Sequence, residues 1–214
     1  MGKCLVGLWV ALVVATVGAC LAPQFTYVAN SDEHAYFKVP NGWHKIKDSS
    51  LSKELNGSSS GQKDDVWSVG YDADAAPAAA HVFGSQTTQP FAFALVGKLN
   101  ENASNTMSYN QLRDFFLPVT SPARQNATQS GFPLTSFHLL KDSTLMPGQG
   151  VHGVRVTFDY TFPDGSTDTF DQIAFTDAND TKVYVLVVHC LASCYSHHKK
   201  VINTVMTSFT VRSP

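Results

Sequence analysis

The stretch Lys182-Val-Tyr-Val-Leu-Val-Val-His189 predicts a strand that is buried on both faces. Successive side chains of a strand point to opposite faces, and here both alternating sets are apolar. One set is Val183, Val185 and Val187, and the other is Tyr184, Leu186 and Val188. A strand covered on both sides lies in the interior of a sheet. The fold must therefore place further layers on both faces of a central sheet.

The chain before this strand predicts its neighbours. Between Val154 and Phe162, apolar residues alternate with a polar set, Arg155, Thr157, Asp159 and Thr161. This alternation is typical of a half-buried strand with one polar face. Pro163-Asp164-Gly165 predicts a turn, and Thr169–Thr176 predicts the returning strand. We take the polar face, together with a Ser-, Gly- and Lys-rich loop at Asp48–Asp65, as the candidate ligand surface.

Two helices and further strands complete the expected domain. Ser108-Tyr-Asn-Gln111 has the form of a capping box and predicts a short helix after it. Apolar residues at helical spacing predict a second helix over 193–207, followed by a short strand over 208–212. Strands are also expected at 66–71, 91–99 and 133–140, and Pro40-Asn41-Gly42 predicts a hairpin over 35–46. The prediction is one α+β domain over 34–214, a mostly antiparallel sheet sandwiched by helices in three layers.

The start of the chain predicts export and a lipid anchor. Lys3 precedes an apolar run, Leu5 to Val17, which is followed by Gly18, Ala19 and Cys20. A basic start, an apolar core and small residues before the cleavage site describe a secretory signal peptide. Val17-Gly18-Ala19-Cys20 also resembles the bacterial lipobox. The resemblance implies cleavage after residue 19, acylation of Cys20 by chains such as palmitate, and attachment to the outer face of the cell membrane. Residues 20–33 would then form a tether.

Three other interpretations of the N-terminal segment stay open. The apolar run could be an uncleaved transmembrane helix, although it barely reaches the required length. It could be an ordinary signal peptide, which would leave Cys20 unmodified. It could be a myristoylation site, but Val6 stands where that motif has Ser or Thr.

Two segments resemble a known family. Phe37-Lys-Val-Pro-Asn-Gly-Trp-His44 looks like the opening hairpin of the Mog1/PsbP-like superfamily. The end of the chain, with Tyr184–Val188, a helix and Ser208–Val211, is similar to that family's last strand, helix and edge strand. The superfamily includes actinobacterial envelope lipoproteins of the LpqN/LpqT-like type, which carry a lipobox and a short tether. The resemblance implies a three-layer fold and an accessory or binding role, with no shared catalytic motif.

Composition excludes some functions. The formal net charge is −2 at pH 7, whereas a nucleic-acid-binding surface needs clustered basic charge. We find no Walker or His-Glu-x-x-His motif, and we expect no cofactor, no metal and no catalytic residue. The expectation is a non-catalytic envelope binding module whose partner is an unidentified protein or small ligand.

The segment His189-Cys-Leu-Ala-Ser-Cys-Tyr-Ser-His-His198 is the richest cluster of reactive side chains. In an oxidising compartment Cys190 and Cys194 are expected to form a disulfide. The alternatives are a metal site or a thiol-dependent enzyme that uses the histidines. His189 and Cys190 are neighbours in a strand and would point to opposite faces, which argues against their acting as a pair.

Overall fold

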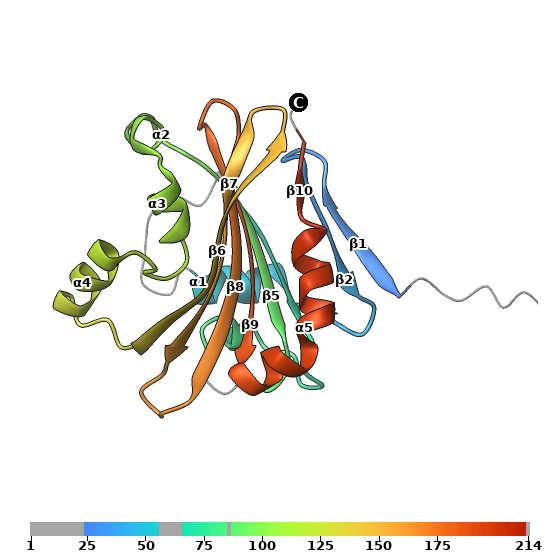
Figure 1. The fold of residues 1–214 in the computed structure, drawn as a ribbon. Coiled ribbons are helices and arrows are strands. Elements are labelled where there is room, and N and C mark those ends of the chain that lie inside the picture. The colour runs from blue at the N-terminus through green and yellow to red at the C-terminus, as the bar shows by residue number, and fades with distance from the viewer. Residues whose placement is uncertain (1–23, 56–65, 85–86, 213–214) are drawn as a thin grey trace, which may run out of the picture.

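The computed structural model describes residues 24–55, 66–84 and 87–212 (Figure 1). The expected signal peptide, Cys20 and the second half of the loop Asp48–Asp65 lie outside the described residues. Within the described ranges, no helix has both the length and the apolar character needed to cross a membrane.

A seven-stranded antiparallel sheet forms the centre of the domain. Its order is β3-β4-β5-β9-β8-β7-β6. The strands are β3 (His44–Lys45), β4 (Val66–Asp72), β5 (Phe91–Lys98), β6 (Thr135–Gly148), β7 (Val151–Thr161), β8 (Thr167–Thr176) and β9 (Lys182–Leu191). β9 occupies the middle position, and all of its residues from Val183 to Cys190 are buried. The prediction of a central strand covered on both faces is confirmed.

One face of this sheet is covered by a helix and a small second sheet. Helix α5 (Ala192–Thr207) packs on this face, and β1 (Phe25–Asn30), β2 (Ala35–Pro40) and β10 (Thr210–Val211) form the three-stranded sheet beside it (Figure 1). Ile202, Val205 and Met206 of α5 are fully buried against strand residues such as Leu186 and Val188. Burial of this apolar stripe is what holds α5 in place.

Five short helices of the described residues lie on the side of the other face, and of these α2 and α4 bury no residue. They are α1 (Asp48–Leu55), the 3₁₀-helix η1 (Ala79–Val82), α2 (Glu101–Thr106), α3 (Tyr109–Arg113) and α4 (Ser121–Gln129). Ser108 caps α3 by accepting a hydrogen bond from the Gln111 backbone N–H, as the capping box predicted. Leu51 of α1 and Leu112 of α3 are buried beneath this layer. The three-layer α+β architecture is confirmed.

The hairpin expected over 35–46 is wrong. The turn itself forms, because the Trp43 N–H donates to the Pro40 carbonyl at 3.0 Å. However, β2 on its N-terminal side pairs with β1 and β10, whereas β3 on its C-terminal side pairs with β4 of the large sheet. The turn therefore transfers the chain from one sheet to the other.

Two segments expected to be irregular contain regular structure. Phe25–Asn30, assigned to the tether, is strand β1 and pairs residue by residue with β2. Asp48–Leu55, assigned to the loop, is helix α1, whose Leu51 is fully buried. Strand β1 is fixed by pairing with the adjacent strand β2, and helix α1 by burial of Leu51 against Val82, Phe91 and Phe93. Local composition shows neither the pairing nor the burial.

Gly153 should be intolerant of any side chain. A Cβ built at this position of β7 would lie 2.0 Å from the Ala174 carbonyl oxygen and 2.8 Å from Phe175 Cα. Both are backbone atoms of β8 and cannot move without breaking the ladder. We expect Gly153→Ala to lower the free energy of unfolding by roughly 3 kcal/mol, measured by urea unfolding followed by circular dichroism.

Gly42→Ala is the matched control for Gly153, because a Cβ there meets nothing within 4 Å. It should change the free energy of unfolding by less than about 0.5 kcal/mol. Equal losses in the free energy of unfolding for the two variants would contradict the prediction. They would show that the close approach of β7 and β8 does not require a glycine at position 153.

Candidate functional site

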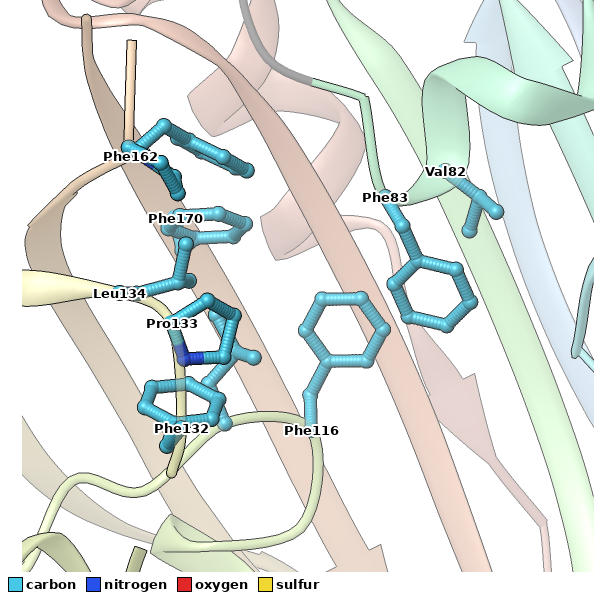
Figure 2. A pocket seen from close by; sticks show the side chains of 10 residues that line it. Val82, Phe83, Phe116, Phe132, Pro133, Leu134, Phe162 and Phe170 are labelled. Atoms are coloured by element: carbon cyan, nitrogen blue, oxygen red, sulfur yellow. The ribbon is translucent and has the colours of Figure 1, made fainter. Parts of the chain in front are cut away.

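An apolar pocket lies where one end of the large sheet meets the layer of short helices. Its volume is about 290 Å³. Figure 2 shows Val82, Phe83 and Phe116 on one side and Phe132, Leu134 and Phe170 on the other. The full lining is Val82, Phe83, Phe116, Leu117, Phe132, Pro133, Leu134, Phe162, Pro163 and Phe170. The end of helix η1, four connections and strand β8 therefore build a single concave surface.

A row of aromatic side chains supports the pocket floor. Phe158, Phe170, His189 and Phe91 lie opposite one another on β7, β8, β9 and β5. The Phe170 ring is 5.5 Å from the Phe158 ring and 5.0 Å from the His189 ring, with interplanar angles of 16° and 14°. Stacking on both sides fixes the Phe170 ring. The floor is thus rigid before any ligand arrives.

The connection that carries Phe116 is held by polar contacts with the sheet. The Gln172 side chain is fully buried; its carbonyl oxygen accepts from the Phe116 backbone N–H at 3.1 Å, and its amide nitrogen donates to the Leu112 carbonyl at 2.8 Å. Asp114 closes the same loop by accepting from the backbone N–H groups of Val119 and Thr120, both at 2.7 Å. Hydrogen bonds to a charged group are the stronger ones. This wall of the pocket is therefore preformed.

The pocket suits an apolar group. None of its ten lining side chains carries a polar atom, so water finds few hydrogen-bond partners there. Phe83 is 49% exposed although it is stacked on Phe116 at 5.6 Å. An aromatic ring half open to solvent marks the pocket mouth as the place where further apolar surface can be buried.

A buried polar pair lies next to the pocket floor. His189 Nδ1 is 3.3 Å from Asp168 Oδ2, and both side chains are almost completely buried. Among the described residues, neither His189 Nε2 nor Asp168 Oδ1 has a hydrogen-bond partner. Since His189 stacks on Phe170, this pair lies behind the floor of the pocket and does not line it.

Two of the four residues of the expected ligand surface on β7 are buried. Arg155 and Thr157 are 9% and 5% exposed because α5 covers them. Arg155 donates two hydrogen bonds to Asp171, at 2.9 and 2.7 Å, and a third to the Asn203 side chain of α5 at 3.0 Å. The Tyr195 hydroxyl of α5 donates to the same carboxylate at 2.8 Å. These polar residues attach the helix to the sheet and are not open to a ligand.

Electrostatics in this network follow from its burial. Burial alone would lower the pKa of Arg155, but the paired Asp171 carboxylate outweighs it and the pKa rises. Burial also raises the pKa of Tyr195, and Asp171 adds to that shift. At the outer end of the face, Asp159 accepts from Thr169 Oγ1 at 2.6 Å, and the Thr161 and Thr167 hydroxyls are 3.1 Å apart. Asp159 and Thr161 are only partly buried, so this outer end of the face stays open to solvent.

The Cys190–Cys194 disulfide predicted from the sequence is present. It joins the end of β9 to the first turn of α5 and leaves neither sulfur free as a thiolate ligand. Within the described part of the chain, no three His, Cys, Asp or Glu side chains converge as a metal site would require. His189 and Cys190 point to opposite faces, as expected, since His189 stacks on Phe170 while Cys190 bonds to the helix.

Comparison with known proteins identifies the fold. No family model matches the sequence, and no curated protein matches it. Among solved structures, the chain resembles the cyanobacterial PsbP protein CyanoP from Synechocystis sp. PCC 6803, with a TM-score of 0.54 and 12% identity over 93% of this chain and 99% of that one. The chain therefore has the Mog1/PsbP-like fold that its two ends resemble in sequence.

Two looser similarities accompany this one. A variant of the protein Mog1 has a TM-score of 0.44 and 12% identity, covering 88% of this chain and 96% of that chain. LpqN, described as involved in cell envelope biogenesis of Mycobacterium tuberculosis, has a TM-score of 0.39 and 13% identity, covering 89% of this chain and 91% of that chain.

Tyr160 should give the domain an alkaline stability limit. Its hydroxyl donates to the Pro118 carbonyl at 2.6 Å and so supports the pocket wall, and burial raises its pKa to about 12. Because this pKa lies above the unfolded value of about 10, the associated stability is fully present below pH 10 and is lost as the pH rises towards 12. We expect Tyr160→Phe to cost about 1 kcal/mol at pH 7 and to flatten the loss above pH 10.

Urea unfolding at a series of pH values measures both effects. Tyr184→Phe is the control, because burial also raises the pKa of Tyr184 to about 12 but this residue packs in the core on the α5 face of the sheet. It should flatten the alkaline loss without loosening the wall at Pro118. A Tyr160→Phe curve parallel to that of the wild type above pH 10 would contradict the prediction.

Proposed function

We propose that this chain is an exported lipoprotein, anchored by acylated Cys20 at the outer face of the cell membrane, whose domain binds an apolar group of a ligand in the aromatic pocket. The binding is non-catalytic. The observation that carries the binding role is the pocket of about 290 Å³, none of whose lining side chains carries a polar atom. The ligand is a protein segment or a small amphiphile, and nucleic acid is not a partner because the chain has a net negative charge.

The size of the pocket limits what it holds. Ligand pockets commonly measure about 300–1,000 Å³, so this one accepts part of a ligand, such as an aromatic ring or a short run of methylenes. Burying about 100 Å² of apolar surface there contributes roughly 2.5 kcal/mol, or a factor of somewhat under one hundred in affinity. The polar remainder of the ligand would stay at the mouth beside Phe83.

The lining also supports a non-catalytic role. Acid–base and nucleophilic catalysis need a titratable or nucleophilic side chain within hydrogen-bond reach of the reacting atom. The ten lining residues offer none, and the nearest buried pair, Asp168 and His189, is separated from the cavity by the Phe170 ring.

The short distance between anchor and domain fits a role at the membrane surface. The first strand begins at Phe25, so five Cα steps separate it from Cys20. At 3.8 Å or less per step, this linker reaches about 19 Å at most, and the pocket can meet only partners that approach the membrane. A domain held in this way samples ligands in or beside the lipid surface.

Removing the ring at the mouth should weaken binding without unfolding the domain. We expect Phe83→Ser to raise the Kd for the fluorescent apolar probe N-phenyl-1-naphthylamine about tenfold, because Phe83 lines the cavity and is half-exposed, and the substitution removes the ring against which the probe would be buried. Fluorescence titration of the full-length protein measures the Kd, and circular dichroism checks the fold.

Phe115→Ser is the matched control for Phe83. Phe115 is also a partly exposed phenylalanine, 37% accessible, but it does not line the cavity. Its substitution should leave the probe Kd within twofold of the wild type. If both variants weaken the probe equally, or if the wild type binds no probe, the pocket is not the binding site.

The anchor is tested separately. We expect intact-mass analysis of the wild type recovered from membranes to show loss of residues 1–19 and added acyl groups on Cys20. Cys20→Ser should move the protein from the membrane fraction to the soluble fraction, because two acyl chains supply most of the membrane affinity. Cys4→Ser, within the removed segment, is the control and should leave fractionation unchanged. An unlipidated wild-type protein in the medium would overturn the lipoprotein proposal.

A further inference from the structure

A second feature, the Cys190–Cys194 disulfide, lies at the junction of β9 and α5. Its two cysteines have different surroundings. Cys190 is completely buried at the end of the central strand, whereas Cys194 is 8% exposed in the first turn of the helix. The bond therefore has one enclosed sulfur and one that borders the surface.

An open surface pocket of about 410 Å³ adjoins Cys194. Its lining is Thr88, Gln89, Leu191, Ser193, Cys194, His197 and His198. The two imidazoles are three and four residues beyond Cys194, the spacing that places side chains on one helix face. None of the lining residues is acidic, and Lys199 and Lys200 follow directly. A thiolate at Cys194 would thus meet cationic or neutral neighbours.

The start of α5 is also free to stabilise an anion. Leu191 stands at the N-cap and provides no side-chain acceptor, and the first turn holds no acidic residue. The first backbone N–H groups of a helix have no partners within it and carry a partial positive charge. A cysteine thiolate in the first turn is stabilised in such a place, and its pKa falls.

The scaffold does not depend on the bond. β9 is hydrogen-bonded to β5 and β8 along its length, and α5 is held by Ile202, Val205 and Met206 in the core. Because the disulfide closes a loop of only four residues' separation, it restricts the unfolded chain little. The domain can therefore keep its fold with the bond open.

We propose that the Cys190–Cys194 disulfide exchanges with a dithiol, a cysteine pair of a second protein at the outer face of the membrane, and that Cys194 is the sulfur attacked. The partner thiolate forms a bond to Cys194 Sγ while the Cys190–Cys194 bond breaks. The electron pair leaves on Cys190 Sγ, which takes up a proton. This function is separate from binding in the aromatic pocket, and neither depends on the other.

The second step completes the balance. The partner's other thiol, after losing its proton, attacks its own sulfur in the mixed disulfide and releases Cys194 as a thiolate, which takes up the second proton. The partner has then lost two electrons and two protons, and the Cys190–Cys194 pair has gained them. Burial and the neighbouring His197 lower the pKa of His198, which favours its neutral form, and a neutral imidazole can accept the proton from an incoming thiol.

The reduction kinetics of the native full-length protein test the proposal without any substitution. Dithiothreitol is the probe dithiol, and mass mapping of the peptide containing both cysteines reports the redox state. We expect the rate to rise in proportion to dithiol concentration while circular dichroism stays unchanged. A reduction rate independent of dithiol concentration would overturn the proposal. So would reduction that occurs only when the circular dichroism signal of the folded domain is lost.

A matched pair of variants identifies the attacked sulfur. In Cys190→Ser, the Cys194 thiol should be alkylated by iodoacetamide at pH 6 about tenfold faster than glutathione and should form a mixed disulfide with oxidised glutathione. In Cys194→Ser, the Cys190 thiol should react at least tenfold more slowly than glutathione. Both variants also contain Cys4 and Cys20, so alkylation is measured only on the peptide that contains residues 190 and 194. Equal slowness at both positions would show that the bond is only structural.

Discussion

The fold depends on burying β9 from both sides. Six of its residues, Val183–Val188, are 3% exposed or less, and no single layer can cover both faces of one strand. The large sheet satisfies this constraint with two kinds of cover, since α5 and the small sheet lie on one face and the short helices on the other. Each residue so buried contributes on the order of 1.5–3 kcal/mol. The segments that cover the two faces come from different parts of the chain, and the topology brings them together on the sheet.

Short helices and loops do not cover the second face of the large sheet completely. The layer of α1 to α4 consists of helices of nine residues or fewer, so loops rather than helix faces meet the sheet at its end. Those loops carry phenylalanines, and the aromatic rings bridge the space without filling it. The pocket is therefore a consequence of how the second face is covered. Its rigidity comes from Gln172 and the Phe158–Phe170–His189 row of the sheet below.

Sequence patterns predicted the parts of the fold that are encoded locally. The double apolar alternation of Lys182–His189 located the central strand, and Ser108 with Gln111 located a helix start. The turn at Pro40–Gly42 was also located, but a turn signal does not say which sheet the next strand joins. The missed strand β1 and helix α1 have weak local patterns and depend on partners elsewhere.

The candidate site was less predictable, for two physical reasons. Arg155 and Thr157 alternate with apolar residues, as solvent-facing residues do, but their cover comes from Tyr195 and Asn203, about forty residues further on. The aromatic pocket combines Phe83, Phe116, Phe132 and Phe162 from four connections, and no spacing rule links them. Their only signal in the sequence is that phenylalanines stand beside prolines and turns, where burial in a regular strand or helix is not available to them.

The two proposed sites share one support at the end of β9. His189 and Cys190 are consecutive, so their side chains leave the strand on opposite faces. His189 stacks behind the pocket floor, and Cys190 connects to α5. Because β5 and β8 pair with this part of β9, through Phe91 and Phe170 opposite His189, the strand end stays fixed whether or not the disulfide is closed. Since Ile202, Val205 and Met206 hold α5 in the core, we expect opening of the bond to release only the first turn of the helix. One strand end could then support a binding pocket and a thiol-exchange site without coupling them.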